Sequence, residues 1–116
     1  MPGPESKFTR EIMKKLRAHP WLDNAVIFKL NDFYTSGVPD LVIAINGIST
    51  WFELKVEPGV PTKLQQFYLD KLQPRAYVVT LKKDKMIAFD PELDSVKSIN
   101  EAVELMSHLA HKDTRK

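Results

Sequence analysis

The sequence predicts an α/β domain in which helices flank a mixed β-sheet, in the element order α β β β α β β α. Apolar residues recur at helical spacing near both ends of the chain, and an Asn-Gly dipeptide joins two apolar runs in its middle. The chain has 116 residues, of which 43% are hydrophobic. We therefore expect one domain over residues 1–116 with its own core, and a frayed tail at residues 112–116.

The first helix is predicted over residues 4–19. Phe8, Ile12 and Leu16 recur at the spacing of one helix face, and a proline follows. A short β-rich run at residues 25–30 predicts the first strand.

A β-hairpin is predicted in the middle of the chain, with strands at residues 40–45 and 48–56. The dipeptide Asn46-Gly47 between them is typical of a two-residue turn. In such a turn Ile45 pairs with Ile48, and counting back along both strands places Asp40 opposite Glu53.

The second half of the chain supplies a helix, a strand pair and a last helix. The last helix opens with Ser98 and Glu101, a capping-box pattern. Strands at residues 76–81 and 86–89 are predicted to pair around a basic turn. The helix between the hairpin and this strand pair ends before Pro74. Its apolar side is expected to carry Leu64, Phe67, Tyr68 and Leu72.

Asp40 and Glu53 are predicted to share one face of the hairpin, together with Lys55. Directly opposite residues have Cβ atoms about 5 Å apart, so two carboxylates there repel each other unless a cation lies between them. Glu5 falls within the apolar arc of the first helix and points inward, where a carboxylate needs a partner. These acids predict an oxygen-ligand site of the kind that Mg²⁺ or Mn²⁺ prefers. We expect Lys55 to be exposed on this face.

Several of these residues stand in an order that resembles a known enzyme family, the PD-(D/E)xK nucleases. Within it the chain is most similar to the virus-type replication-repair nuclease (VRR-NUC) branch, over residues 5–81. The residues that carry the resemblance are Gly37-Val38-Pro39-Asp40, Glu53-Leu54-Lys55, Gly59 and Thr62-Lys63-Leu64-Gln65.

This resemblance implies a restriction-endonuclease-like fold and a Mg²⁺- or Mn²⁺-dependent phosphodiesterase. It implies that Asp40, Glu53, the main-chain carbonyl of Leu54 and Glu5 hold the ion. Lys55 would assist the nucleophilic water, and Gln65 would line the site. Small members of this branch are similar to phage Holliday-junction resolvases and usually work as homodimers.

Each motif also has a purely structural interpretation. Asp40 could simply follow a proline in a turn, and Glu53 with Lys55 could form a solvated strand face. Thr62 and Gln65 match a capping box that needs no catalytic function.

Four lysines are candidate contacts to a nucleic-acid backbone: Lys29, Lys63, Lys82 and Lys83. Lys63 begins a helix, whose positive end favours phosphate. Lys82 and Lys83 belong to a basic turn, and such turns are most often only solvated.

Composition excludes several classes of protein. The chain has no cysteine, which excludes disulfide scaffolds, zinc-cysteine sites and thiol nucleophiles. No run of roughly 18 apolar residues is present, so we expect a cytoplasmic protein with no membrane partner. The resemblance to phage resolvases is compatible with a phage gene expressed in a bacterial host. The net charge of +2 names no partner by itself.

Together these features predict a metal-dependent DNA endonuclease. The resemblance further implies that it is selective for branched DNA, such as four-way junctions, and acts as a homodimer. Alternatives are a nuclease of the same fold that acts on flaps, single strands or duplex DNA, and a module that binds nucleic acid without cutting it. A metabolic α/β protein with a carboxylate metal site is disfavoured, because the chain has no Gly-rich phosphate loop.

Overall fold

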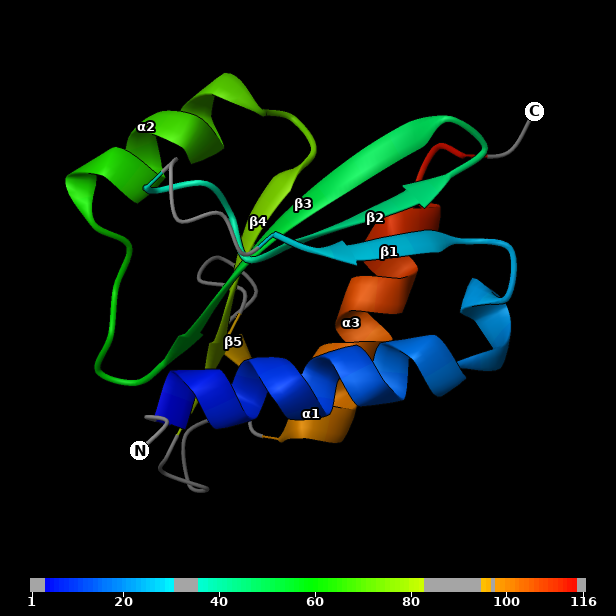
Figure 1. The fold of residues 1–116 in the computed structure, drawn as a ribbon, viewed down its shortest axis with the longest axis horizontal. Coiled ribbons are helices and arrows are strands. Elements are labelled where there is room, and N and C mark those ends of the chain that lie inside the picture. The colour runs from blue at the N-terminus through cyan, green and yellow to red at the C-terminus, as the bar shows by residue number, and fades with distance from the viewer. Residues whose placement is uncertain (1–3, 31–35, 83–94, 97, 115–116) are drawn as a thin grey trace.

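The computed structural model describes residues 4–30, 36–82, 95–96 and 98–114, with only the backbone described at residues 4–6 and 95–96. It confirms the α/β class, a mixed sheet flanked by helices (Figure 1). The elements are α1 (Pro4–Ala18), the 3-10 turn η1 (Pro20–Leu22), β1 (Val26–Lys29), β2 (Leu41–Ile45), β3 (Ile48–Val56), α2 (Lys63–Lys71), β4 (Ala76–Leu81), β5 (Ser95–Val96) and α3 (Ile99–His111).

The strands lie in the order β1-β2-β3-β4-β5. Strand β2 is antiparallel to both β1 and β3, whereas β3, β4 and β5 run parallel. The parallel neighbour of β4 is the short strand at Ser95–Val96. The strand predicted at residues 86–89 and most of its basic turn lie outside the described residues.

The predicted hairpin is confirmed, with Ile45 and Ile48 as Cα partners. Asn46 and Gly47 both have positive φ, 53° and 79°, as a two-residue turn of this kind requires. Because side chains alternate along a strand, this register decides which face of the sheet each residue of β2 and β3 occupies.

The two faces of the sheet are covered differently (Figure 1). Helices α1 and α3 pack on one face, where Leu41, Ile43, Phe52 and Leu54 join the hydrophobic core. Helix α2 lies over β4 on the other face, the one to which Asp40, Glu53 and Lys55 belong by alternation. The candidate site thus lies on the face opposite the main core.

Helix α2 differs from its prediction in the side that it buries. Leu69 is buried, whereas Leu64 and Phe67 of the predicted apolar side are exposed. The cause is that α2 touches the sheet mainly at β4, so only one stripe of a nine-residue helix is covered. None of the helices in the described ranges is long and apolar enough to cross a membrane.

The start of the expected frayed tail is held in place. Thr114 is 2% exposed, and its carbonyl accepts a hydrogen bond of 3.1 Å from the Asn46 side-chain amide. This contact anchors residues 112–114 beside the hairpin turn. The polar composition of this segment predicts a frayed tail because it gives no sign of the contact.

Candidate metal centre

Asp40 and Glu53 meet where β2 begins. Leu41 and Phe52 are Cα partners, so Asp40, one residue earlier, lies opposite Glu53. Strand β2 does not extend past this point, and the Asp40 carboxylate accepts a hydrogen bond of 2.6 Å from the Leu54 N–H. The side chain of Asp40 therefore occupies the edge of β3 that β2 leaves uncovered.

The main-chain carbonyl of Leu54 faces the same edge. Trp51 and Glu57 donate their N–H groups toward β4, to the carbonyls of Arg75 at 2.8 Å and Leu81 at 3.0 Å. The intervening even-numbered residues of β3 face the opposite way, because main-chain N–H and C=O groups of one residue point to one edge. The Leu54 N–H donates to Asp40 at the edge of β3 that faces away from β4, so the Leu54 carbonyl oxygen points to the same edge.

Glu53 and Lys55 are buried side by side. Their side chains are 2% and 8% exposed, and the Lys55 Nζ lies 3.6 Å from the Glu53 Oε2. The expectation that Lys55 is exposed is therefore wrong: β3 is covered on both faces along this stretch. The other oxygen, Glu53 Oε1, is buried with no hydrogen-bond partner among the described residues.

The pKa of the Glu53 carboxyl is raised from its ordinary value of 4.5 to about 8. Burial is the largest cause, and the charge of Asp40 adds to it, while the Lys55 ammonium acts in the opposite direction. A hydrogen bond between the two carboxyl groups, which needs a proton on one of them, raises the pKa further. In the absence of a metal, Glu53 thus retains a proton at neutral pH.

This donor set fits a hard divalent cation. Mg²⁺ and Mn²⁺ prefer carboxylate and carbonyl oxygens, and they would replace the proton that Glu53 holds. The unpartnered Oε1 of Glu53 has the lone pairs for such a bond. Among the described residues no group of three or more His, Cys, Asp or Glu side chains gathers. Glu5 begins α1, but its side chain lies outside what is described.

Gln65 takes the structural role that its position allows. Its side-chain oxygen accepts a hydrogen bond of 2.8 Å from the Thr62 N–H, and the Thr62 hydroxyl accepts one from the Gln65 N–H. This capping box fixes the start of α2. Because the Gln65 side-chain oxygen is used in this capping box, its NH₂ is the group that would contact a ligand at the site.

Gly37 packs against α2 and so positions the loop that leads to Asp40. A Cβ atom at Gly37 would lie 2.6 Å from the Leu64 Cγ and 3.1 Å from the Leu64 carbonyl carbon. Its φ of +88° is also one that L-residues rarely adopt. The first turn of α2 is thereby held over the loop at residues 36–39.

Replacing Gly37 with alanine is expected to destabilise the protein by about 2–4 kcal/mol, the sum of a left-handed φ and an overpacked contact. Gly47→Ala is the matched control, because its φ is +79° but nothing lies within 4 Å of an added Cβ. Urea unfolding of the two variants isolates the contact with Leu64. Equal losses of stability would show that Gly37 does not hold α2.

The candidate lysines do not all reach the site. Lys82 falls on the same face as Lys55 by alternation, and exposed Lys63 is the first residue of α2. Lys29 pairs with Leu41, a core residue, so it belongs to the opposite face. Lys83 lies outside the described residues.

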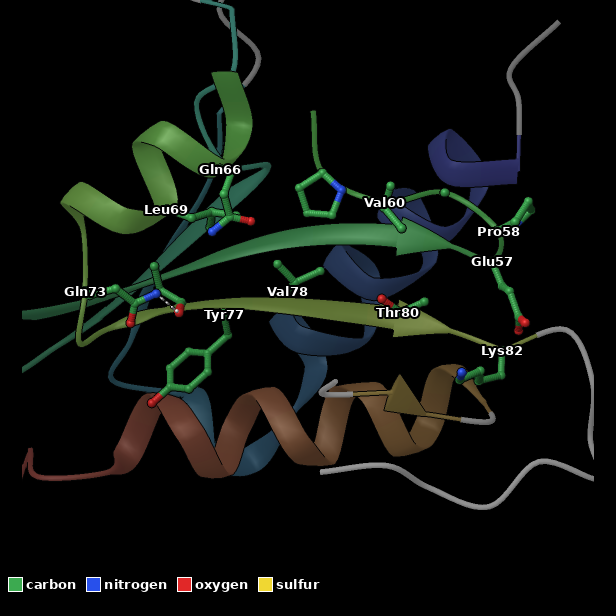
Figure 2. Close-up of a pocket in the computed structure, with 13 residues that line it drawn as sticks. Glu57, Pro58, Val60, Gln66, Leu69, Gln73, Tyr77, Val78, Thr80 and Lys82 are labelled. Atoms are coloured by element: carbon green, nitrogen blue, oxygen red, sulfur yellow. Dashed lines mark hydrogen bonds between the residues drawn. The ribbon is translucent and has the colours of Figure 1, made fainter. Parts of the chain in front are cut away.

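Sequence reasoning missed a hollow beside these residues. It lies between β4, α2 and the loop at residues 57–61, and Val78 and Thr80 are part of its floor (Figure 2). Val78 and Thr80 are the Cα partners of Glu53 and Lys55. The only sequence feature that marks this hollow is the Pro- and Gly-rich composition of the loop. That the loop forms one wall of the hollow depends on the fold.

Comparisons of this chain with models of known protein families, with curated proteins and with solved structures find no match.

Proposed function

We propose that the protein is a Mg²⁺- or Mn²⁺-dependent endonuclease of restriction-endonuclease-like fold that hydrolyses DNA phosphodiester bonds. The observation that carries the proposal is the half-buried Asp40 opposite the buried Glu53 at the uncovered edge of β3, with the buried Lys55 beside them. Burying an acid and a lysine beside a second acid costs stability, and clusters of this kind are concentrated at functional sites. The ordered motif supports the nuclease family, and the mixed sheet between helices is compatible with its fold.

A divalent cation, when bound, polarises a phosphate oxygen and lowers the pKa of water. Asp40, Glu53 and the Leu54 carbonyl would hold it at the edge of the sheet. Asp40 is already oriented by the Leu54 N–H, which fixes one carboxylate before any ligand arrives. This preorganisation reduces the reorganisation needed during the reaction.

Lys55 is the residue that would act on the water and the phosphate. Its ammonium is held 3.6 Å from the Glu53 carboxyl group, in surroundings that exclude most solvent. A cation in such surroundings stabilises charge developing on a phosphate more strongly than one in water. It would also orient the attacking water in line with the bond that breaks.

The proposal includes branched DNA as substrate and a homodimer as the active form. Exposed apolar residues support association: Val26 and Phe28 on edge strand β1, and Leu64 and Phe67 on α2. Val26 and Phe28 share a sheet face with Asp40 by register, and α2 covers part of that face. A two-fold dimer built there would present two metal centres to two DNA strands.

The test is cleavage of a labelled four-way junction and of the matching linear duplex, with Mg²⁺, with Mn²⁺ and with chelator. The expected result is paired symmetric cuts in the junction, abolished by chelator, from a protein that sediments as a dimer. Equal cutting of junction and duplex would remove the selectivity for branches but keep the nuclease. Binding without metal-dependent cutting of either DNA would favour the non-cleaving module.

A further inference from the structure

The hollow beside the candidate metal centre has the size of a ligand site. Its volume is about 420 Å³, within the range of roughly 300–1,000 Å³ typical of small-molecule pockets. Strand β4 forms its floor, α2 one wall, and the loop at residues 57–61 the other (Figure 2). It is open to solvent, so a group attached to a larger molecule can enter.

The hollow adjoins the proposed catalytic residues. Val78 and Thr80 on its floor are the Cα partners of Glu53 and Lys55 on the adjacent strand. Neighbouring strands lie about 5 Å apart, and paired positions in a sheet present their side chains to the same face. A phosphate held at Glu53 and Lys55 therefore has the hollow directly beside it, within reach of the next nucleoside along the chain.

The lining suits a flat group with apolar faces and polar edges. Val60, Leu69 and Val78 supply aliphatic contacts, and Figure 2 shows Val60 above β3 with Val78 between the two strands. Amide and hydroxyl groups of Gln66, Gln73 and Thr80 stand around them. A nucleobase presents this combination, since its faces pack against apolar side chains and its edges form hydrogen bonds.

Charge at one end of the hollow fits the same ligand. Lys82 lines it at the end of β4, where the backbone phosphate of a bound nucleotide would be attracted. Glu57 also lines that end, and its negative charge offsets part of this attraction. The apolar middle is left to the base.

We propose that this hollow binds one unpaired nucleobase of the DNA strand that is cut, next to the scissile phosphate. The proposal rests on the nuclease function above and names the substrate feature that the enzyme reads. A base stacked in a duplex cannot enter, and unstacking is least costly where the base is already unpaired. Branched or interrupted DNA is thus preferred over perfect duplex without contacts that read sequence.

The experiment compares two duplexes, one with a single unpaired thymine and one with an abasic residue at the same position. Their affinities are measured by fluorescence anisotropy in Ca²⁺, used in place of Mg²⁺ to suppress cutting. The wild-type protein is expected to bind the thymine duplex about tenfold more tightly, comparable to the loss of one stacked base. Equal affinity for both duplexes would overturn the proposal.

Val78→Phe, which fills the hollow, is expected to bind both duplexes equally. Ala18→Phe, which adds the same ring at the exposed last residue of α1 on the other face of the sheet, is the matched control and keeps the tenfold difference. Val60→Ala, on the exposed loop, replaces Val78→Phe if that variant does not fold, and is expected to reduce the difference at least twofold. A tenfold difference that persists in the substituted hollow would place the base elsewhere.

Cutting of the same duplexes in Mg²⁺ separates this proposal from the proposed function. Metal-dependent cutting with no dependence on the base would overturn the nucleobase site and leave the nuclease intact. Binding that depends on the base, without any cutting, would support the nucleobase site while removing the nuclease.

Discussion

Lys55→Met is expected to lower the rate of DNA cleavage by at least about 100-fold, the usual effect of losing a group that stabilises charge or transfers a proton at the reacting centre. Methionine keeps most of the volume of the buried lysine stem, so the fold should persist. Circular dichroism and urea unfolding check this. Single-turnover cleavage of a junction in Mg²⁺ measures the effect itself.

If Lys55 acts only by lowering the pKa of Glu53, the activity of Lys55→Met will depend on pH differently than if Lys55 acts directly on the substrate. Without the ammonium, the pKa of the Glu53 carboxyl rises further, because Lys55 is the group that lowers it. Activity lost for that reason would recover as the pH is raised, whereas loss of a direct role would persist at every pH. Lys14→Met, an exposed position on α1, is the control and should cut like the wild type. Full activity of Lys55→Met would exclude the lysine from the reaction.

Glu53→Gln is expected to abolish binding of the divalent cation and to change how the stability of the metal-free protein depends on pH. In the wild type the folded-state pKa of Glu53, about 8, lies above the ordinary value of 4.5. Between these values the folded state holds a proton that the unfolded state has released, so stability falls as the pH rises. The slope is at most about 1.4 kcal/mol for each pH unit.

Urea unfolding in chelator at several pH values between 5 and 9 tests this expectation. Glu53→Gln should remain stable where the wild type loses stability, because glutamine has no proton to release. The control is Glu11→Gln, at an exposed position on α1, which should keep the slope of the wild type. A wild-type stability that does not fall between pH 5 and 8 would contradict the raised pKa.

The sequence predicted the part of the site that depends on local geometry. The Asn46-Gly47 turn determines the register, and the register alone places Asp40 opposite Glu53. The capping box of Thr62 and Gln65 is likewise local, since its hydrogen bonds join residues three apart. Such features follow from a few dihedral angles and need no knowledge of the rest of the chain.

Features that depend on contacts between distant segments were not predicted. The burial of Lys55 requires β3 to be covered on both faces, and a strand read alone gives only alternation. Arg75 donates hydrogen bonds to the carbonyls of Ser49, Ala110 and Lys112, which joins β3 to the end of α3. An arginine beside a proline in the sequence gives no sign of these partners. The hollow beside β4 arises in the same way, from three separate segments.

The most direct test of the metal centre is paramagnetic relaxation of the backbone amide signals by Mn²⁺. Mn²⁺ broadens the NMR signals of nuclei near it, so it locates the ion independently of any activity. We expect the amide signals of Asp40, Glu53 and Leu54 to broaden first, and those of His108 and His111 at the end of α3 to stay sharp. Broadening that begins at the α3 histidines, or none at all near Glu53, would contradict a metal site between Asp40 and Glu53.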